Sequence, residues 1–154
     1  IFSNAALHWM TNPEKVMEGV SRALKKGGRF VAETGCKGNV RKIENAIFET
    51  VEKYNMKAKK CWFFPTPEEK TELLEKYGLK VKRMISFPRP TLLPTGIKGW
   101  LQTFSAPILV NIPVELHEKL IDEITEKLEN ELEKNEKGQI LADYIRLRFE
   151  AVKE

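Results

Sequence analysis

The fold class follows from a short apolar run, Arg29-Phe30-Val31-Ala32-Glu33-Thr34, whose centre contains no polar residue. A half-buried strand alternates apolar and polar side chains. An unbroken apolar centre is instead typical of a strand that is covered on both faces, as in a parallel sheet. We therefore predict a buried strand over residues 29–34.

The segments before this run predict another strand and a helix. Residues 1–6 are short and largely apolar, which predicts a buried strand whose end opens into a loop. Asn12-Pro13 is typical of a helix start, with Asn12 as the N-cap and proline at the first helical position. Apolar residues then recur at helical spacing up to Gly27-Gly28, namely Val16, Met17, Val20 and Leu24. A strand, a helix and a strand form a right-handed crossover unit.

The remainder of the chain predicts further helices and two more strands. Asn39 is a candidate cap for a helix whose apolar stripe continues to Val51. The capping box Thr66-Pro67-Glu68-Glu69 begins a helix that is expected to end at Gly78. Residues 79–87 alternate as a half-exposed or edge strand does, and residues 142–153 alternate as a final antiparallel strand does.

An insertion is predicted between these last two strands, over residues 88–138. Residues 88–113 contain closely spaced proline and glycine among large apolar side chains, so we expect an irregular segment that acts as a lid over a pocket. Residues 114–134 have apolar residues four apart among Glu and Lys, which predicts a long amphipathic helix.

Length and composition exclude several classes of protein. The 154 residues suit one domain, 1–154, and the net charge of +4 is spread along the chain, so we expect no nucleic-acid partner. No apolar run approaches the ~20 residues that span a bilayer, and no secretory signal is visible, so we expect no membrane partner and a cytoplasmic location. Cys36 and Cys61 lack a CxxC spacing, so we expect reduced thiols and no metal site.

Few side chains are suited to chemistry. His117 lies on the charged helix and is most simply solvated. His8 follows a strand, and open α/β sheets bind their ligands at the carboxyl ends of strands. Asn4 and Trp9 accompany it, and both a ligand-binding and a structural role are open for His8.

Other candidates come from loops and from the last strand. The segment Gly35–Asn39 lies between a strand and a helix, where it is either a ligand contact or a tight loop. Arg146 shares a predicted strand face with Tyr144, and its guanidinium either holds a substrate carboxylate or is solvated. Trp100 and Phe104, four residues apart, pack in the core or lid or line a pocket.

Five segments, in this order and spacing, resemble the class I S-adenosylmethionine-dependent methyltransferases, closest to the trans-aconitate methyltransferase-like group. The segments are Phe2-Ser3-Asn4-Ala5-Ala6-Leu7-His8-Trp9, Leu24-Lys25-Lys26-Gly27-Gly28-Arg29-Phe30, Glu33-Thr34-Gly35-Cys36-Lys37-Gly38-Asn39, Gly99-Trp100-Leu101-Gln102-Thr103 and Tyr144-Ile145-Arg146-Leu147-Arg148-Phe149. The resemblance implies an α/β fold with a partial Rossmann-like sheet, flanking helices and a helical or irregular lid. Its strands would be the fourth to the seventh of seven, with the last antiparallel.

The resemblance also implies how the site is divided. The family's glycine-rich loop, which holds S-adenosyl-L-methionine, would belong to an N-terminal half before Ile1, and a chain that begins without methionine fits this expectation. By the family's pattern, the cofactor-binding residues beside the sulfonium would be Asn4, Ala5, His8 and Trp9. The substrate-binding residues would be Asn39, Trp100, Tyr144 and Arg146.

The function that the resemblance implies is methyl transfer to a small-molecule acceptor. A carboxylate is the first choice, because it is already a nucleophile and a site with few titratable residues then suffices. A quinone-like acceptor is an alternative. A different alternative is a non-catalytic module that acts by association, because an exposed edge strand at residues 1–6 would demand a partner such as a second copy of the chain.

Overall fold

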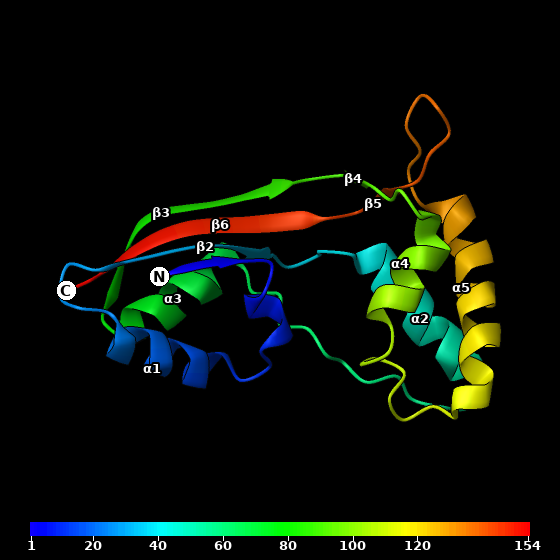
Figure 1. Ribbon diagram of the computed structural model, residues 1–154, viewed down its shortest axis with the longest axis horizontal. Helices are drawn as coiled ribbons and strands as arrows, with labels where there is room; N and C mark the ends of the chain where they lie inside the picture. Colours follow the sequence, from blue (N-terminus) through cyan, green and yellow to red (C-terminus); the bar gives the residue numbers. More distant parts are fainter. The chain divides into compact units, whose positions relative to one another are not determined.

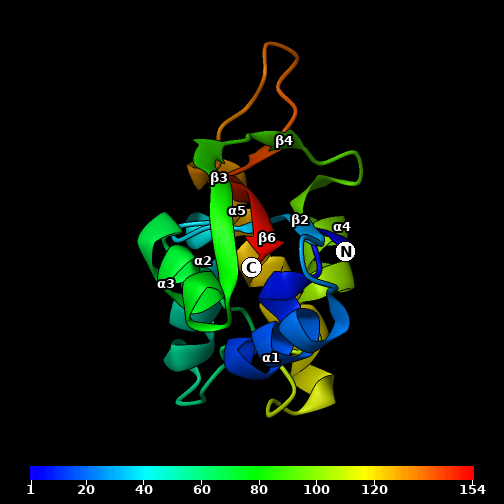
Figure 2. The same cartoon turned by 90° about the vertical axis from the view of Figure 1, so that its left-hand side faces the viewer.

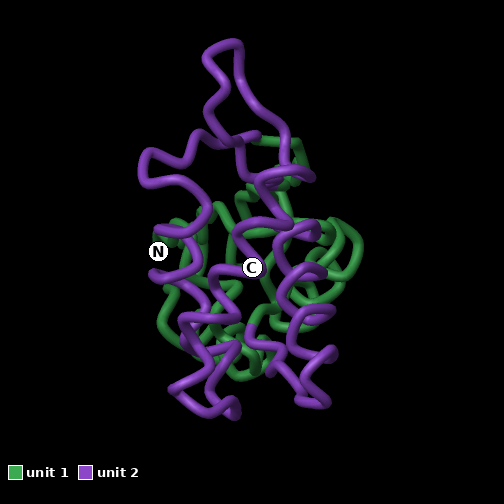
Figure 3. Tube along the Cα trace, turned by 90° about the vertical axis from the view of Figure 1, so that its right-hand side faces the viewer, with its two compact units in different colours: residues 1–39, 62–89, 145–154 green, residues 40–61, 90–144 purple.

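The computed structural model describes residues 1–154, which divide into two compact units. Unit 1 comprises residues 1–39, 62–89 and 145–154, and unit 2 comprises residues 40–61 and 90–144 (Figure 3). Both units are therefore assembled from segments that lie far apart in the sequence.

Unit 1 contains a mixed four-stranded sheet. Its strands are β1 (Phe2–Asn4), β2 (Arg29–Gly35), β3 (Leu79–Pro88) and β6 (Ile145–Lys153), in the order β1-β2-β6-β3 (Figure 1). β1 and β2 are parallel, whereas β6 is antiparallel to both β2 and β3. The predicted α/β class and the antiparallel last strand are thus confirmed.

Two helices of unit 1 lie on the same face of this sheet, α1 (Pro13–Ala23) and α3 (Pro67–Lys76) (Figures 1 and 2). Asn12 caps α1 by accepting a hydrogen bond from the backbone N–H of Lys15. Thr66 and Glu69 form the predicted capping box of α3. Both helix starts were therefore predicted correctly, because each depends only on neighbours within a few residues.

The core of unit 1 lies between these helices and the sheet. Phe30 of β2 and Phe149 of β6 meet edge to face with centroids 5.2 Å apart, and Met17 and Leu74 from the two helices pack in the same cluster. Burying each such side chain contributes about 1.5–3 kcal/mol. This core holds one face of the sheet rigidly, and the other face carries polar residues.

Unit 2 is mainly helical. It contains three α-helices, a short 3-10 turn and a two-stranded ribbon, which are α2 (Arg41–Lys53), α4 (Gly96–Phe104), η2 (Val114–Leu116), α5 (His117–Glu131), β4 (Thr91–Leu92) and β5 (Leu141–Ala142). The side chains of Ile43, Leu101 and Ile124, one from each α-helix, are fully or almost fully buried. None of the helices in the chain combines the length and the apolar composition that crossing a bilayer requires.

Two sequence-based predictions were wrong in their details of burial and capping. The first strand is exposed rather than buried, with Phe2 76% exposed, because β1 is the edge strand and β2 is its only neighbour. Asn39 does not cap α2; its Oδ1 accepts a hydrogen bond from the backbone N–H of Ile145. The N-cap is Val40 with φ 49°, and Asp143 Oδ2 accepts from the N–H of Lys42 in the first turn.

Two further predictions missed element boundaries. The segment 88–113 is not irregular throughout, because it contains α4 and the short strand β4. The final strand does not begin at Ala142, since β5 pairs with β4 and β6 starts at Ile145. The long amphipathic helix is confirmed, although its first turn is the 3-10 turn η2 and it ends at Glu131, with Gly138 in a later turn.

Lys70 of α3 is an unusual member of the core of unit 1. Its side chain is only 2% exposed, and its Nζ lies 5.4 Å from the centroid of the Phe149 ring. Desolvation by burial lowers the pKa of Lys70 from 10.5 to about 8. The folded protein therefore holds this proton less tightly than the unfolded chain does, so burial of the charged form costs stability at neutral pH.

Replacing Lys70 with methionine should stabilise the protein at pH 7 by about 1–3 kcal/mol, because it removes the buried charge and keeps the apolar stem. The wild-type stability should rise relative to the variant between pH 8 and 10.5, where the unfolded chain binds a proton that the folded protein lacks. Urea denaturation as a function of pH measures both effects. The exposed Lys25→Met is the control, with an expected change within about 0.5 kcal/mol; a Lys70 variant that is less stable at pH 7 contradicts the prediction.

Candidate functional site

The carboxyl ends of β1 and β2 lie side by side, because the two strands are parallel. Just after β1, Ala5 adopts a left-handed backbone conformation with φ 53°, and its N–H donates to the carbonyl of Glu33 at 2.9 Å. This turn leads directly into a 3-10 turn, η1 (Leu7–Trp9). The exposed Asn4 and the turn that carries His8 and Trp9 are therefore placed at the carboxyl ends of these strands, the position at which open α/β sheets generally bind ligands.

His8 is held at the end of β2. Its side chain is 7% exposed, and its Nδ1 accepts a hydrogen bond from the backbone N–H of Gly35 at 3.2 Å. The Oγ1 of Thr34 lies 3.1 Å from the same nitrogen. Burial, together with the positive charge of Arg146, lowers the pKa of His8 from 6.5 to about 4. The imidazole is therefore neutral at physiological pH.

The histidine ring packs with three other aromatic rings, and each of the four rings contacts two of the others. We call this group the aromatic cluster; its members are His8, Trp9, Trp62 and Phe64. The centroid distances are 5.8 Å for His8–Trp9, 5.6 Å for Trp9–Trp62, 5.8 Å for Trp62–Phe64 and 5.6 Å for Phe64–His8. These separations are typical of favourable aromatic pairs. Trp9 is 37% exposed, so the cluster presents part of its apolar surface outside the core.

Gly35 allows the aromatic cluster to pack on the sheet. A Cβ atom at this position would lie 2.4 Å from the Phe64 ring, a distance that real Cβ contacts do not show. Phe64 therefore rests directly on the backbone of β2. The residue that sequence analysis placed in a loop is in fact the last residue of the strand, and its missing side chain is what the site requires.

Positive charges gather on the open face of the sheet, beside this cluster. In the register, Gly35 is opposite Arg146, which is opposite Phe87, and Glu33 is opposite Arg148. Glu33 accepts hydrogen bonds from Arg148 Nη2 at 2.5 Å and from Arg89 Nη1 at 2.7 Å. The group comprising Arg89, Arg146 and Arg148, here called the arginine cluster, thus carries three positive charges around the single carboxylate of Glu33.

The pKa of Glu33 reflects the nearby positive charges. Partial burial acts to raise the pKa of Glu33, but the hydrogen bond and charge of Arg148, with the charges of Arg89 and Arg146, leave it lowered. The carboxylate is therefore ionised, and within this group of four side chains the three guanidinium charges outnumber it. Such an excess of positive charge is suited to attract an anion.

Of the remaining predicted residues, Asn39 lies against Gly35 in unit 1, with its Nδ2 3.1 Å from the position that a Cβ of Gly35 would take, and Trp100 and Tyr144 belong to unit 2. Trp100 is buried in unit 2, where its Nε1 donates to the Tyr144 hydroxyl at 2.6 Å and its ring packs against Phe104. Tyr144 lies before β6 and so does not share a strand face with Arg146, which was the sequence-based expectation. Asn39 is buried in unit 1 with its amide oxygen on the Ile145 backbone.

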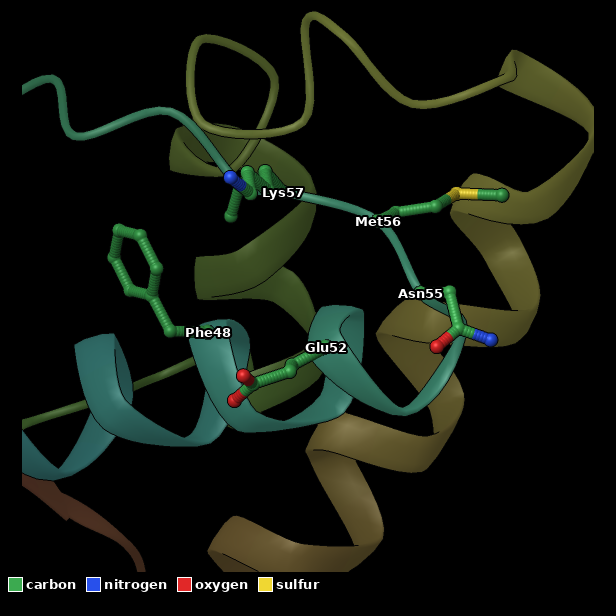
Figure 4. A pocket seen from close by; sticks show the side chains of 6 residues that line it. Phe48, Glu52, Asn55, Met56 and Lys57 are labelled. Atoms are coloured by element: carbon green, nitrogen blue, oxygen red, sulfur yellow. The ribbon is translucent and has the colours of Figure 1, made fainter.

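A separate groove lies in unit 2, with a volume of about 500 Å³. It is lined by one face of α2 and the segment that follows it, namely Phe48, Glu52, Asn55, Met56, Lys57 and Ala58 (Figure 4). None of these residues was predicted to bind a ligand. The chain contains no group of three or more His, Cys, Asp or Glu side chains arranged to hold a metal ion.

Sequence analysis missed Trp62, Phe64, Arg89 and Glu33 as members of the site. Trp62 and Phe64 lie in a segment with no regular secondary structure, so no periodic pattern marks them. Their aromatic density, Trp62-Phe63-Phe64, was the available signal. The pairing of Glu33 with Arg148 depends on the register of two strands that are more than 100 residues apart.

Comparisons with known proteins agree with this fold. Residues 1–32 match the sequence profile of the family described as "Methyltransferase domain". An uncharacterised methyltransferase of Schizosaccharomyces pombe is 36% identical, and the match covers 100% of this chain but 62% of that relative. A Bacillus halodurans protein assigned to the methyltransferases has a TM-score of 0.56 at 16% identity, over 99% of this chain and 68% of that one. The YcgJ protein of Bacillus subtilis has a TM-score of 0.54 at 13% identity, over 100% and 63%.

The chain is similar to class I methyltransferases. The two solved structures show that the fold is Rossmann-like, and both sequence matches are to methyltransferases. The chain spans about 62% of the length of the curated relative that it matches. The trans-aconitate-like group remains a prediction.

Gly35→Ala should destabilise the protein by about 1–3 kcal/mol, because the new methyl group would overlap the Phe64 ring and force the aromatic cluster off the strand. Near-ultraviolet circular dichroism should change with it, since four aromatic side chains move. Gly19→Ala in α1 is the matched control: nothing lies within 4 Å of the added Cβ, so it should stabilise by about 0.5–1 kcal/mol. Equal stability of the two variants would contradict the close packing.

Proposed function

We propose that this chain is part of an S-adenosylmethionine-dependent methyltransferase of the trans-aconitate methyltransferase-like group, and that its acceptor is a small-molecule carboxylate. The observation that supports the acceptor class is the arginine cluster beside the aromatic cluster, at the carboxyl ends of β1 and β2. An anion with an apolar or unsaturated body suits this combination of surplus positive charge and aromatic surface.

The residues at this edge of the sheet suit the cofactor. The sulfonium group is a cation, and the face of an aromatic ring such as that of Trp9, which is 37% exposed, attracts cations. Asn4 is exposed at the end of β1, which leaves its side-chain amide accessible to a ligand, and Ala5 is exposed beside it. We propose that Asn4, Ala5, His8 and Trp9 lie beside the sulfonium, as the resemblance implies.

The proposed chemistry asks little of titratable side chains. S-adenosylmethionine, which Asn4, Ala5, His8 and Trp9 would hold, would supply an electrophilic methyl group to the carboxylate oxygen to form an ester bond, and the electron pair of the broken carbon–sulfur bond would stay on sulfur. No proton is transferred, so the site needs no general base. Arg146 orients the carboxylate by a charge-assisted hydrogen bond, and the aromatic cluster excludes water from the reacting atoms.

This function is tested on the full-length product of the gene that encodes the chain. Incubation with methyl-labelled cofactor and a panel of mono-, di- and tricarboxylates should yield a product that releases labelled methanol in alkali, as methyl esters do. Arg146→Gln should raise the acceptor KM about 10-fold or more with a smaller effect on kcat, since a hydrogen bond to a charged group contributes about 1.5–3 kcal/mol.

The control for that variant is Arg83→Gln, which removes an exposed arginine of β3 and should leave the acceptor KM unchanged. Label that stays attached in alkali would indicate a carbon or ether product, and a quinone-like acceptor would replace the carboxylate. An Arg146 variant with an unchanged KM would remove this residue from the acceptor site.

We also propose that the chain self-associates through β1. β1 has a free edge, and Ile1, Phe2 and Met10 expose apolar surface beside it. A strand edge with neighbouring apolar side chains favours pairing with another strand, here from a second copy. Sedimentation velocity at ~50 μM should show a dimer that Phe2→Lys weakens, whereas Val114→Lys, at an exposed position in unit 2, should not. A monomer in both cases would contradict the proposal.

A further inference from the structure

The two ring nitrogens of His8 differ in a way that the backbone determines. The N–H of Gly35 is a donor only, and it points at Nδ1 from 3.2 Å. Nδ1 must therefore offer a lone pair, and the hydroxyl of Thr34 can only donate to it. In the neutral ring the proton then belongs to Nε2.

This tautomer is held by the rigid part of unit 1. Gly35 is the last residue of β2, and β2 is paired with β6 through Gly35 itself. The ring of His8 is also fixed between its neighbours Trp9 and Phe64. Rotating the imidazole ring or moving the Gly35 N–H would break these contacts. The Nε2–H is therefore a preorganised donor.

The surroundings also keep a second proton off the ring. Burial and the positive charge of Arg146 disfavour the imidazolium, and the hydrogen bond from Gly35 occupies the nitrogen that would have to accept the proton. His8 therefore cannot serve as a proton acceptor through Nε2, which already carries its proton, or through Nδ1, which is engaged. This excludes the general-base role that a histidine at such a position would otherwise suggest.

We propose that His8 is a positioning residue whose Nε2–H donates a hydrogen bond to the anionic group of the acceptor, alongside the charge of Arg146. The proposal rests on the proposed function for the identity of the reaction. It deepens it by assigning selectivity: the two groups proposed to contact the anion, the Nε2–H of His8 and the guanidinium of Arg146, are both donors, so the site favours acceptors that are anionic before they bind. An amine or a phenol, which would have to lose a proton, is disfavoured.

The tautomer is tested by long-range ¹H–¹⁵N correlation spectra of the full-length protein with ¹⁵N-labelled histidine. The His8 signals, assigned by their loss in His8→Asn, should show a protonated Nε2 and an unprotonated Nδ1 that do not change between pH 5.5 and 8. A protonated Nδ1, or titration of the ring between pH 6 and 7, would overturn the proposal. This readout does not depend on methyl transfer.

The binding role is tested with benzoate, an aromatic carboxylate, as the probe. In His8→Asn, the side-chain oxygen can replace Nδ1 as the acceptor for Gly35 but no donor remains at the Nε2 position. In His8→Gln, the side-chain amide replaces the Nε2–H donor instead. We expect the dissociation constant for benzoate to rise about 10-fold in His8→Asn and to recover most of this loss in His8→Gln.

Benzamide, which is neutral, should bind the wild type more weakly than benzoate does, because its carbonyl can accept from the Nε2–H but does not use the charge of Arg146. Equal benzoate affinity in the wild type and His8→Asn, or no benzoate binding by the wild type, would overturn the proposal.

The role of His8 and the proposed methyl-transfer reaction can each be refuted without the other. Methyl-ester formation with an unchanged acceptor KM in His8→Asn refutes the role of His8 alone, whereas the expected benzoate and tautomer results without an alkali-labile product refute the proposed reaction alone.

Discussion

The hydrogen bond from the backbone N–H of Gly35 to Nδ1 of His8 connects the sheet with the candidate site. It joins the turn that follows β1 to the end of β2, and it determines which nitrogen of the imidazole carries the proton. The same glycine leaves room for Phe64, whose ring lies where a Cβ would be. One residue without a side chain thus supports both the polar and the aromatic part of the site.

The antiparallel strand β6 brings the arginine cluster to this point. Because side chains alternate along a strand, Arg146 and Arg148 project to the face opposite the apolar core, where the register places them beside Gly35 and Glu33. The ion pairs of Glu33 with Arg148 and Arg89 involve guanidinium groups that are largely exposed, so each contributes no more than about 1 kcal/mol to folding. Their main effect is on where the charges lie, with three guanidinium groups around one carboxylate.

Two other features of the fold depart from what local sequence favours, a buried lysine in the core and a helix cap supplied from a distant residue. Lys70 is buried against Phe149 without a carboxylate partner that would stabilise its charge, and its lowered pKa reflects that cost. The first turn of α2 receives its side-chain cap from Asp143, about 100 residues downstream, rather than from a neighbouring residue. Long-range contacts of this kind tie distant segments of a unit together, at positions where local sequence preferences are weak.

The sequence by itself determined the features that depend on near neighbours. The caps at Asn12 and at Thr66, the apolar run of β2 and the alternation of β6 were all predicted, since propensity, capping and periodicity act within a few residues.

His8 was identified as a candidate from its place after a strand. Its protonation state and its neighbours were decided only by the tertiary structure: Phe64 and Arg146 come near it through strand pairing and loop packing between segments far apart in the chain. The exposure of β1 and the distant cap of α2 were decided in the same way. Such contacts have no local signature, because the free energy that forms them comes from burying and pairing surfaces that meet only in the folded protein.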